Sequence, residues 1–461
     1  MAPETSVAAL WAPLAWLPEG WRDNVLLRID GSGRWAEVTA NVATPPAGVQ
    51  VLAAPLLPAL ANAHSHAFQR AFAGAAERRD AESDDFWSWR ERMYAVASRI
   101  TPVQLRAIAA QLYVELLKGG YSHVCEFHYL RRDRDGGDYA DPLAMSWALA
   151  DAAADAGIGL TILPVLYERF GFDAPLRESQ RRFRASAEET ASAAQRIAAS
   201  ARPLVDAGLA IHSLRAADAE GIVALATLAQ SVDGPIHIHV AEQTAEVDAC
   251  LRATGKRPIE WLADRGIDQR WQLVHATHAL PAEIDAVAAS GAGVVVCPST
   301  EANLGDGLFD LPRWLASGVP LSLGSDSHCT RDWREELRLL EYGQRIVRRE
   351  RNVAAAPELG QPSTAERLFA RVVEGSRAAT HRPAWGLVVG ARADALLVDR
   401  HDGALRGLDP RHSLDALVFS SPTAPWRDVM VAGRWVFRNG LHLDSEAIAE
   451  RYAGTLMELG S

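Results

Sequence analysis

Cysteine is scarce in this sequence. The 461 residues contain only four, and no two of them form a CxxC pair. Widely spaced cysteines are typical of a reducing compartment, in which thiols stay free. We therefore predict a cytoplasmic protein with buried thiols and with neither disulfides nor a cysteine metal site. The four residues are Cys125, Cys250, Cys297 and Cys329.

Long apolar runs and a basic leader are also missing. No stretch of about 20 consecutive apolar residues occurs, so we predict no membrane-spanning helix. The N-terminal stretch MAPETSVAALWAPLAWLPEG lacks a basic start and is interrupted by prolines. These features argue against a signal peptide.

Positive charge is in the minority. There are 47 Lys and Arg residues against 58 Asp and Glu, which gives a formal net charge of -11. This charge argues against nucleic acid or an anionic membrane surface as the main partner. If the ligand is an anion, arginines must create a local positive site. With 48% hydrophobic and 23% charged residues, the composition is otherwise that of an ordinary soluble enzyme.

From Val51 onward the order of predicted elements favours one architecture. Eight short apolar runs alternate with helical segments, as a parallel sheet covered on both faces requires. Thr101 and Pro102 mark the start of one helix, which ends at Lys118 before Gly119. We predict a (β/α)8 TIM barrel, an α/β fold. The predicted strands are 51–60, 121–130, 158–167, 209–214, 235–241, 271–277, 293–297 and 320–324, and the further helices are 142–156, 185–207, 218–230 and 281–289.

Both ends of the chain have the pattern of strands joined by glycine turns. LLRID and WAEVTA flank a Gly-Ser-Gly turn near the N-terminus, and GLVVGARADALLVDR and WRDVMVAGRWVFRNG follow the barrel. We infer a small β-sandwich built from both ends, with the barrel inserted between them. The predicted divisions are 1–55 and 384–461 for the sandwich and 56–383 for the barrel.

The connection 67–100 is long and carries Phe86, Trp87, Trp89 and Arg90. Long connections of this kind in compact domains are usually functional. We predict an active-site loop; the alternative is a loop packed on the barrel rim.

Histidines stand where predicted barrel strands end, which is the edge where barrel enzymes place their sites. His64 and His66 follow the first strand, and side chains at i and i+2 of an extended chain point to the same side. His239 lies in the fifth strand and Asp326 follows the eighth. A buried aspartate is costly unless it is paired or bound to a cation. Three imidazoles and one carboxylate therefore predict a mononuclear metal site with room for water.

Other polar residues at this edge have predicted roles in proton transfer. Glu242, three residues past a ligand, would shuttle a proton to a leaving nitrogen, and Asp326 would take one from water. His275 would polarise the substrate's carbon–nitrogen unit or hold the water; the alternative is that it only supports Asp326. His237, deeper in the barrel, is predicted to be a hydrogen-bonded core histidine, and Cys329 a buried small residue.

Four of these motifs resemble the amidohydrolase superfamily, in its subgroup with a single metal and hydrolytic deaminase activity. They are HSH after the first strand, HVAE on the fifth, HATH on the sixth and GSDSH on the eighth. The split β-sandwich fits the same group, so the resemblance covers essentially the whole chain. More narrowly, ANAHSHAFQRAFAG, FWSWRERMY, CEFHYL, IHSLRA and HIHVAEQ resemble the formimidoylglutamate deiminase family of histidine degradation.

This resemblance implies hydrolysis of N-formimidoyl-L-glutamate to N-formyl-L-glutamate and ammonia. It also implies one zinc ion per chain, although iron or manganese would bind the same ligands. The substrate is a small anionic amidine with two carboxylates, so the site needs cations. Arg90 and Arg215 suit bidentate carboxylate binding. For Arg90 the alternative is a surface ion pair with Glu91 or Asp85.

Further substrate contacts follow from the same resemblance. Gln69 lies three residues past the HSH motif, Tyr129 ends the second strand, and His212 ends the fourth. Together with His275 they are predicted to line the substrate. For Gln69 and Tyr129 the alternative is packing at the barrel rim.

Two other functions stay open, from different classes. A related deaminase acting on an aminated heterocycle such as guanine, adenosine or an s-triazine would favour stacking aromatics and would not need two guanidiniums. A silent barrel that serves as an assembly scaffold has no need of a complete ligand set and Glu242. A homodimer is the predicted assembly, because dimers are the commonest oligomers.

Overall fold

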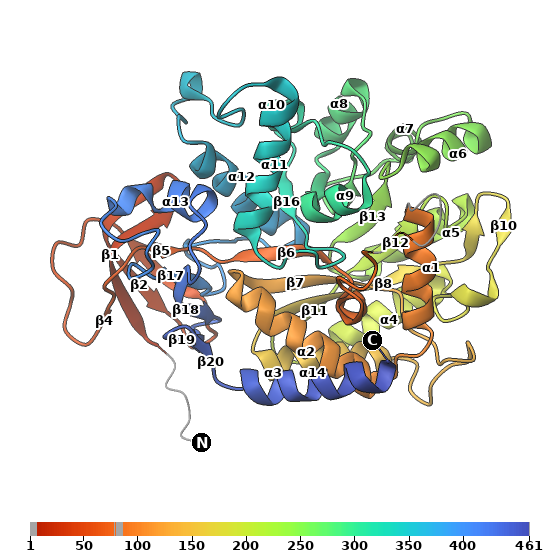
Figure 1. Ribbon diagram of the computed structural model, residues 1–461, viewed down its shortest axis with the longest axis horizontal. Helices are drawn as coiled ribbons and strands as arrows, with labels where there is room; N and C mark the ends of the chain where they lie inside the picture. The colour runs from red at the N-terminus through yellow and green to blue at the C-terminus, as the bar shows by residue number, and fades with distance from the viewer. Residues whose placement is uncertain (1–6, 78, 80–85, 461) are drawn as a thin grey trace.

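The computed structural model describes residues 7–77, 79 and 86–460, with only the backbone of Phe86 and Trp87. Figure 1 shows a barrel surrounded by helices, with a second sheet to one side of it. None of the described helices is long and apolar enough to cross a membrane.

Eight parallel strands form the barrel, and they pair in chain order. Every residue of these strands is buried except His212 in β12, which is expected for strands covered by helices outside and by packed side chains inside. An isolated parallel bridge between Ser65 and Asp326 joins the first strand to the last. The strands are β6 (Leu60–Ser65), β7 (Tyr121–His128), β8 (Gly159–Leu166), β12 (Leu209–Ser213), β13 (Ile236–Val240), β14 (Trp271–His275), β15 (Gly293–Val296) and β16 (Leu321–Leu323), with β11 (Val205–Ala207) added beside β8.

Helices cover the outside of the barrel (Figure 1). The predicted capping of one of them is confirmed: the hydroxyl of Thr101 accepts from the N–H of Gln104, Pro102 opens the helix, and Gly119 follows its end. The helices are α1 (Phe86–Ala97), α2 (Pro102–Lys118), α3 (Ala144–Ala156), α4 (Ala187–Ala199), α5 (Ala219–Leu228), α6 (Thr244–Thr254), α7 (Pro258–Ala263), α8 (Pro281–Ser290), α9 (Pro298–Leu304), α10 (Leu311–Ser317), α11 (Trp333–Arg348), α12 (Thr364–Ala379), α13 (Ser413–Phe419) and α14 (Ser445–Leu459).

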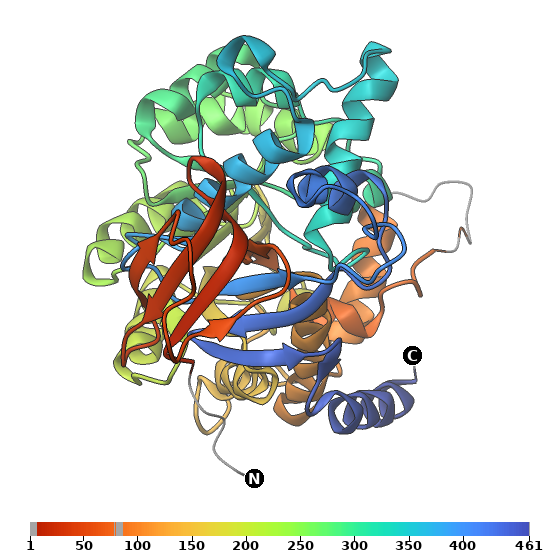
Figure 2. The same cartoon turned by 90° about the vertical axis from the view of Figure 1, so that its left-hand side faces the viewer.

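The second sheet has nine strands and combines both ends of the chain, as predicted. Its red and blue strands lie side by side in Figure 2. Leu56 in β5 joins the two halves, because it pairs with Ala15 on one side and Leu397 on the other. Apolar residues from both halves share one core, which is sandwich-like packing. The strands are β1 (Ala9–Leu17), β2 (Gly20–Ile29), β3 (Trp35–Thr39), β4 (Gln50–Val51), β5 (Leu56–Leu57), β17 (Ala395–Val398), β18 (Trp426–Val431), β19 (Arg434–Arg438) and β20 (Leu441–His442).

The predicted boundaries between the sandwich and the barrel, after residues 55 and 383, stay a prediction.

Shorter elements complete the chain. The last helix, α14, lies along α2 of the barrel (Figure 1). The remaining elements are the hairpin of β9 (Arg169–Gly171) and β10 (Ala174–Pro175), and the 3-10 turns η1 (Ala67–Ala71), η2 (Glu178–Gln180), η3 (Ala229–Ser231), η4 (Pro357–Leu359) and η5 (Pro410–His412).

Two predicted elements are wrong in their bounds. The first barrel strand is not 51–60 but Leu60–Ser65, since Pro55 and Pro58 interrupt the run and its earlier part joins the other sheet. The predicted helix 185–207 ends at Ala199, because Pro203 cannot continue it, and Val205–Ala207 form a strand instead. The other predicted strands and helices match within a few residues.

Candidate metal centre and substrate cavity

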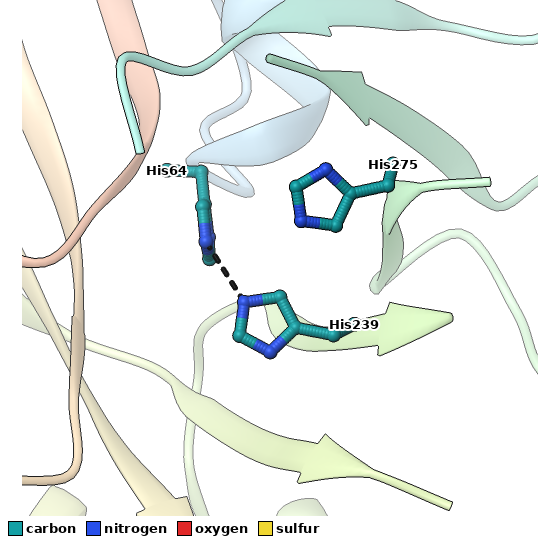
Figure 3. Close-up of side chains that lie close together, drawn as sticks. All are labelled: His64, His239 and His275. Carbon is teal, nitrogen blue, oxygen red and sulfur yellow. Dashed lines mark hydrogen bonds between the residues drawn. The ribbon is translucent and has the colours of Figure 1, made fainter. Parts of the chain in front are cut away.

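The four predicted metal ligands meet at the carboxyl-terminal edge of the barrel. The Nε2 atom of His64 lies 3.1 Å from Nε2 of His66 and 3.0 Å from Nε2 of His239. Oδ1 of Asp326 lies 3.3 Å from the Nε2 atoms of both His64 and His66. Figure 3 shows His64 and His239 pointing toward each other, with His275 beside them.

Hydrogen bonds on the far side of two rings fix where their lone pairs point. Nδ1–H of His66 donates to the carbonyl of Phe127 over 3.0 Å, and Nδ1–H of His239 donates to the carbonyl of His212 over 2.9 Å. A neutral imidazole that carries its proton on Nδ1 has its lone pair on Nε2. Two lone pairs and a carboxylate thus converge on one point near His64.

Burial keeps the cluster in the protonation state that metal ligands need. It lowers the pKa of His64 to about 3, against an opposing effect of Asp326, and it also lowers the pKa of His66 and His239. Burial raises the pKa of Asp326, but the hydrogen bond from His64 and the neighbouring histidines bring it below its usual value. Neutral imidazoles and an ionised carboxylate are the metal-binding forms.

The cluster fits a divalent metal ion. Ligand atoms about 2.0–2.1 Å from one zinc ion lie roughly 3.0–3.4 Å from one another. The distances of 3.0 to 3.3 Å within the cluster agree with this spacing. Converging lone pairs without a cation would repel one another, so the donor set itself calls for a positive charge.

Sharp turns at the strand ends aim these side chains. Ala241, His275 and Asp326 follow or end barrel strands with φ angles of 51°, 69° and 43°. Positive φ is uncommon for residues other than glycine and persists where the surrounding structure enforces it, often at functional sites. Here each turn comes just where the chain leaves the barrel, so the side chains at this edge point toward the cluster.

Glu242 and His275 stand beside the cluster. Nε2 of His275 lies 3.7 Å from Oε1 of Glu242 and 3.8 Å from Oδ2 of Asp326. Burial raises the pKa of Glu242 to about 8. Burial lowers the pKa of His275, but the carboxylates of Glu242, Glu301 and Asp326 outweigh this and raise it to about 10. The arrangement therefore offers two proton carriers next to the candidate metal.

One cavity connects the cluster to every predicted substrate residue. About 550 Å³ of space free of protein atoms, open solvent included, lies at this opening over the barrel edge. Predicted residues that line it are His66, Gln69, Arg90, Tyr129, His212, Arg215, His239, Glu242, His275 and Asp326, and Trp89 from the predicted active-site loop also lines it.

Two predicted substrate residues touch each other. The amide of Gln69 donates to the hydroxyl of Tyr129 over 3.3 Å, and the Tyr129 ring lies 5.1 Å from the ring of His66. The carbonyl oxygen of Gln69 is buried with no partner among the described residues. The pair therefore contacts the candidate metal ligand His66 and, like it, lines the cavity.

The two arginines that line the cavity come from different parts of the chain, one from α1 and one from just after β12. The guanidinium of Arg90 is 4.9 Å from the Phe170 ring and 5.6 Å from the Tyr94 ring. Its side chain is 5% exposed, whereas Arg215 is partly exposed. Asp85, one of the predicted partners of Arg90, lies outside the described residues.

The sequence did not predict several cavity residues. Glu246 is buried and accepts the N–H of Glu242 over 3.1 Å. Its position four residues after Glu242, about one helical turn, was the signal that the sequence offered. The others are Met93, Tyr94, Ser213 and Leu304. Met93 and Tyr94 end the FWSWRERMY motif and Ser213 lies in IHSLRA, so these motifs were the available signal. Leu304 lies outside the motifs, and nothing in the sequence separates it from ordinary packing.

A buried carboxylate behind the cluster was also not predicted. Glu126, 2% exposed, accepts the hydroxyl of Ser65 over 2.7 Å and the N–H of Ala67 over 2.6 Å. These two residues flank His66 in the chain. Glu126 therefore fixes the backbone that carries the HSH motif.

Two predictions beside the site have definite outcomes. His237 is a core histidine, as predicted, because its Nε2–H donates to the carbonyl of Ala379 over 2.9 Å. Cys329 is exposed, so its predicted burial is wrong; it lies past the strand end, in the turn before α11. The other three cysteines are buried, and all four are free thiols.

Comparisons with known proteins agree with this arrangement. The model of the Amidohydrolase family matches residues 56–436. A formimidoylglutamate deiminase of Pseudomonas aeruginosa is 45% identical over 98% of this chain and 100% of its own. A 5-methylthioadenosine/S-adenosylhomocysteine deaminase of Natronomonas pharaonis is 27% identical over 87% of each chain.

A solved structure is similar over the same length. The crystal structure of an amidohydrolase from Brucella melitensis superposes with a TM-score of 0.92 and 39% identity, covering 98% of this chain and 100% of that one. The family model covers most of the barrel and reaches into the second sheet. This chain belongs to the amidohydrolase family.

Proposed function

We propose that this protein is a metal-dependent deiminase that converts N-formimidoyl-L-glutamate and water to N-formyl-L-glutamate and ammonia, in histidine degradation. The observation that carries the proposal is the cavity that joins the metal cluster to Arg90 and Arg215. The 45% identity to a formimidoylglutamate deiminase over nearly the whole chain supports the same substrate.

The reaction exchanges nitrogen for oxygen at one carbon. Water forms a C–O bond with the formimidoyl carbon, the bond from that carbon to its terminal nitrogen breaks, and both water protons leave on ammonia. A site for this reaction must accept a proton from water and deliver protons to the departing nitrogen.

His64, His66, His239 and Asp326 would hold one zinc ion per chain. When bound, the metal supplies Lewis acidity that makes water a better nucleophile near neutral pH. These residues bring three neutral imidazoles and one carboxylate, which suits zinc more than the harder magnesium or calcium ions.

Three residues of the cavity handle protons. Asp326 would accept the proton of the attacking water with the carboxylate oxygen that faces His275. Burial raises the pKa of Glu242, which favours its protonated form, and Glu242 would give a proton to the leaving nitrogen. His275 lies between these two carboxylates and would polarise the formimidoyl group.

The substrate's carboxylates would bind at the other side of the cavity. Arg90 and Arg215 supply planar guanidiniums that can each grip a carboxylate with two hydrogen bonds. Gln69, Tyr129 and His212 line the same cavity and would position the chain of the substrate.

We further infer that the protein works in the cytoplasm as a homodimer. Free thiols throughout fit a reducing compartment, and two-fold dimers are the commonest oligomers. Light scattering coupled to size exclusion would give the mass in solution, and the mass of a single chain would reject the dimer.

Ammonia release from a small panel tests the proposed substrate. The purified enzyme is assayed with N-formimidoyl-L-glutamate, guanine, adenosine and cytosine. We expect fast release from formimidoylglutamate alone. Release from a neutral heterocycle without release from formimidoylglutamate would reject the substrate and favour the rival deaminase, while inactivity on all four with no bound metal would favour the scaffold.

A further inference from the structure

His275 is held from behind by a carboxylate that the sequence analysis did not single out. Nδ1 of His275 lies 3.2 Å from Oε1 of Glu301, and the two side chains are 1% and 4% exposed. Glu301 belongs to α9, the short helix that follows β15. It does not line the substrate cavity.

The carboxylate is itself fixed in place. The same Oε1 atom accepts the backbone N–H of Cys297 over 2.9 Å, at the start of α9. This hydrogen bond fixes the position of Oε1 in the absence of substrate. Because Nδ1 of His275 faces a carboxylate, Nδ1 carries a hydrogen, and the free side of the ring is Nε2.

Nε2 of His275 faces the reacting end of the cavity. It lies 3.7 Å from Glu242 and 3.8 Å from Asp326. The backbone under the ring is unusual, with φ of 69° at His275 and 49° at Ala276. Strained positions persist only where surrounding contacts over-determine them. Among the described residues, Glu301 is the hydrogen-bond partner found for the His275 ring.

We infer that Glu301 is a positioning residue, which fixes the hydrogen on Nδ1 of His275 and keeps Nε2 aimed at the group undergoing hydrolysis. The inference rests on the proposed function for the identity of that group. The contact between the two side chains does not depend on the substrate and is testable by itself.

His275, Cys297 and Glu301 also place three ligand-type atoms within 4.8 Å. A second metal ion at this triad is a rival explanation. Burial raises the pKa of the Cys297 thiol well above its usual value, so it stays protonated, which disfavours metal binding. Elemental analysis separates the two: a second metal ion per chain that is lost in Glu301→Ala would overturn the positioning role.

The chain offers a matched control on α11, which packs against α9. Glu336 is buried and accepts both the N–H and the hydroxyl of Ser299, over 2.8 and 2.6 Å. It therefore supports α9 as Glu301 does, but no contact with His275 is found for it among the described residues. Glu336→Ala removes this support of α9 and leaves the contact between Glu301 and His275 in place.

Kinetics of the metal-loaded enzyme test the effect on turnover. Loss of a group that orients a metal-site or catalytic residue typically costs 10–100-fold. Glu301→Ala should lower kcat by about 10²-fold and leave KM within about threefold, whereas Glu301→Gln, which keeps an acceptor for Nδ1–H, should lose about tenfold or less. Glu336→Ala should keep kcat within about twofold. Equal losses of kcat in Glu301→Ala and Glu336→Ala would show that Glu301 only supports α9.

A double-mutant cycle in stability tests the contact without using activity. Unfolding by urea is measured for the parent, His275→Ala, Glu301→Ala and the double variant. Contacting residues usually couple, so we expect the effect of Glu301→Ala on the unfolding equilibrium constant to shrink at least about threefold when His275 is absent. The cycle with Glu336→Ala should be additive. Additivity for Glu301 would overturn the inference, and an inactive parent would reject the proposed function while leaving this cycle decisive.

Discussion

Ser65 and Asp326 form the backbone bridge that closes the barrel, and candidate metal ligands stand on both sides of that seam. The N–H of Asp326 donates to the carbonyl of His64 over 3.0 Å, and the N–H of His66 donates to the carbonyl of Asp326 over 3.4 Å. The last and first strands thus meet through the residues that would hold the metal. We therefore expect metal binding to stabilise the closed barrel.

Metal removal should lower the stability of the whole barrel. A ligand that binds only the folded state stabilises it by about 4 kcal/mol when its free concentration is 1,000 times Kd. We expect chelation to lower Tm on the order of 5 °C and added zinc to restore it. Scanning calorimetry with and without chelator measures this. An unchanged Tm in a protein shown to have lost its metal would mean that the seam closes without it.

His239→Ala should lose metal and activity together. Two imidazoles and a carboxylate remain, and their geometry no longer closes around the ion. Elemental analysis and ammonia release measure both quantities on one preparation. The control is His237→Gln, two residues earlier on the same strand, where the amide can still donate to the carbonyl of Ala379. It should keep its metal. Comparable metal loss in both variants would mean that a disturbed strand, and not the loss of a ligand, releases the metal.

Glu242→Gln should keep metal and fold but lose most turnover. Gln is nearly isosteric with Glu and cannot carry a proton between water and the leaving nitrogen. General acid–base groups typically contribute 10²–10⁴-fold, so a loss of that size in kcat is expected. Steady-state kinetics on metal-replete protein measures it. A variant within about threefold of the parent would show that another group moves the proton.

Glu126 makes stability depend on pH. Burial raises its pKa to about 8, above the unfolded value near 4.5, so the folded state keeps a proton that the unfolded chain releases. Stability therefore falls as pH rises through this window, by at most about 1.4 kcal/mol per pH unit for one group. Glu126→Gln imitates the protonated side chain and should flatten this fall. Urea unfolding at several pH values between 5 and 8 tests it. The same pH dependence of the unfolding free energy in the parent and in Glu126→Gln would show that Glu126 is not its cause.

Much of the barrel was predictable because its strands are buried on both faces and therefore appear as short apolar runs between helices. The errors have local causes. Pro55 and Pro58 split one apolar run between two sheets, and β1 was not predicted because Pro13 interrupts an otherwise apolar segment. Such a run shows which residues are buried, but it does not show in which sheet they pair.

The residues of the site also divide into those that the sequence predicts and those that it does not. His64, Asp326 and the others stand in short motifs at strand ends, and the order of strands alone brings those ends together. Glu301 lies 26 residues after His275. No spacing rule connects a carboxylate on a short helix to an imidazole at the end of a strand. Contacts of this kind follow from loop conformation, which the local pattern of apolar residues does not determine.

The substrate's carboxylates should depend on Arg215. Replacing it with Met keeps much of the side chain's length and removes charge-assisted hydrogen bonds worth about 1.5–3 kcal/mol each. Since about 1.4 kcal/mol corresponds to a factor of ten, a lost bidentate contact should lower kcat/KM for N-formimidoyl-L-glutamate by roughly 10²-fold or more. Steady-state kinetics measures the loss, with Arg90→Met as the matched variant in the same cavity.

Two truncated substrates assign the contact. N-formimidoyl-4-aminobutyrate lacks the α-carboxylate, and N-formimidoyl-2-aminobutyrate lacks the γ-carboxylate. The parent enzyme should be slow on both, but Arg215→Met should cause little further loss on the compound that lacks the carboxylate Arg215 binds. The other compound should lose as much as the full substrate does. Equal losses on all three compounds would mean that Arg215 supports the cavity wall and holds neither carboxylate.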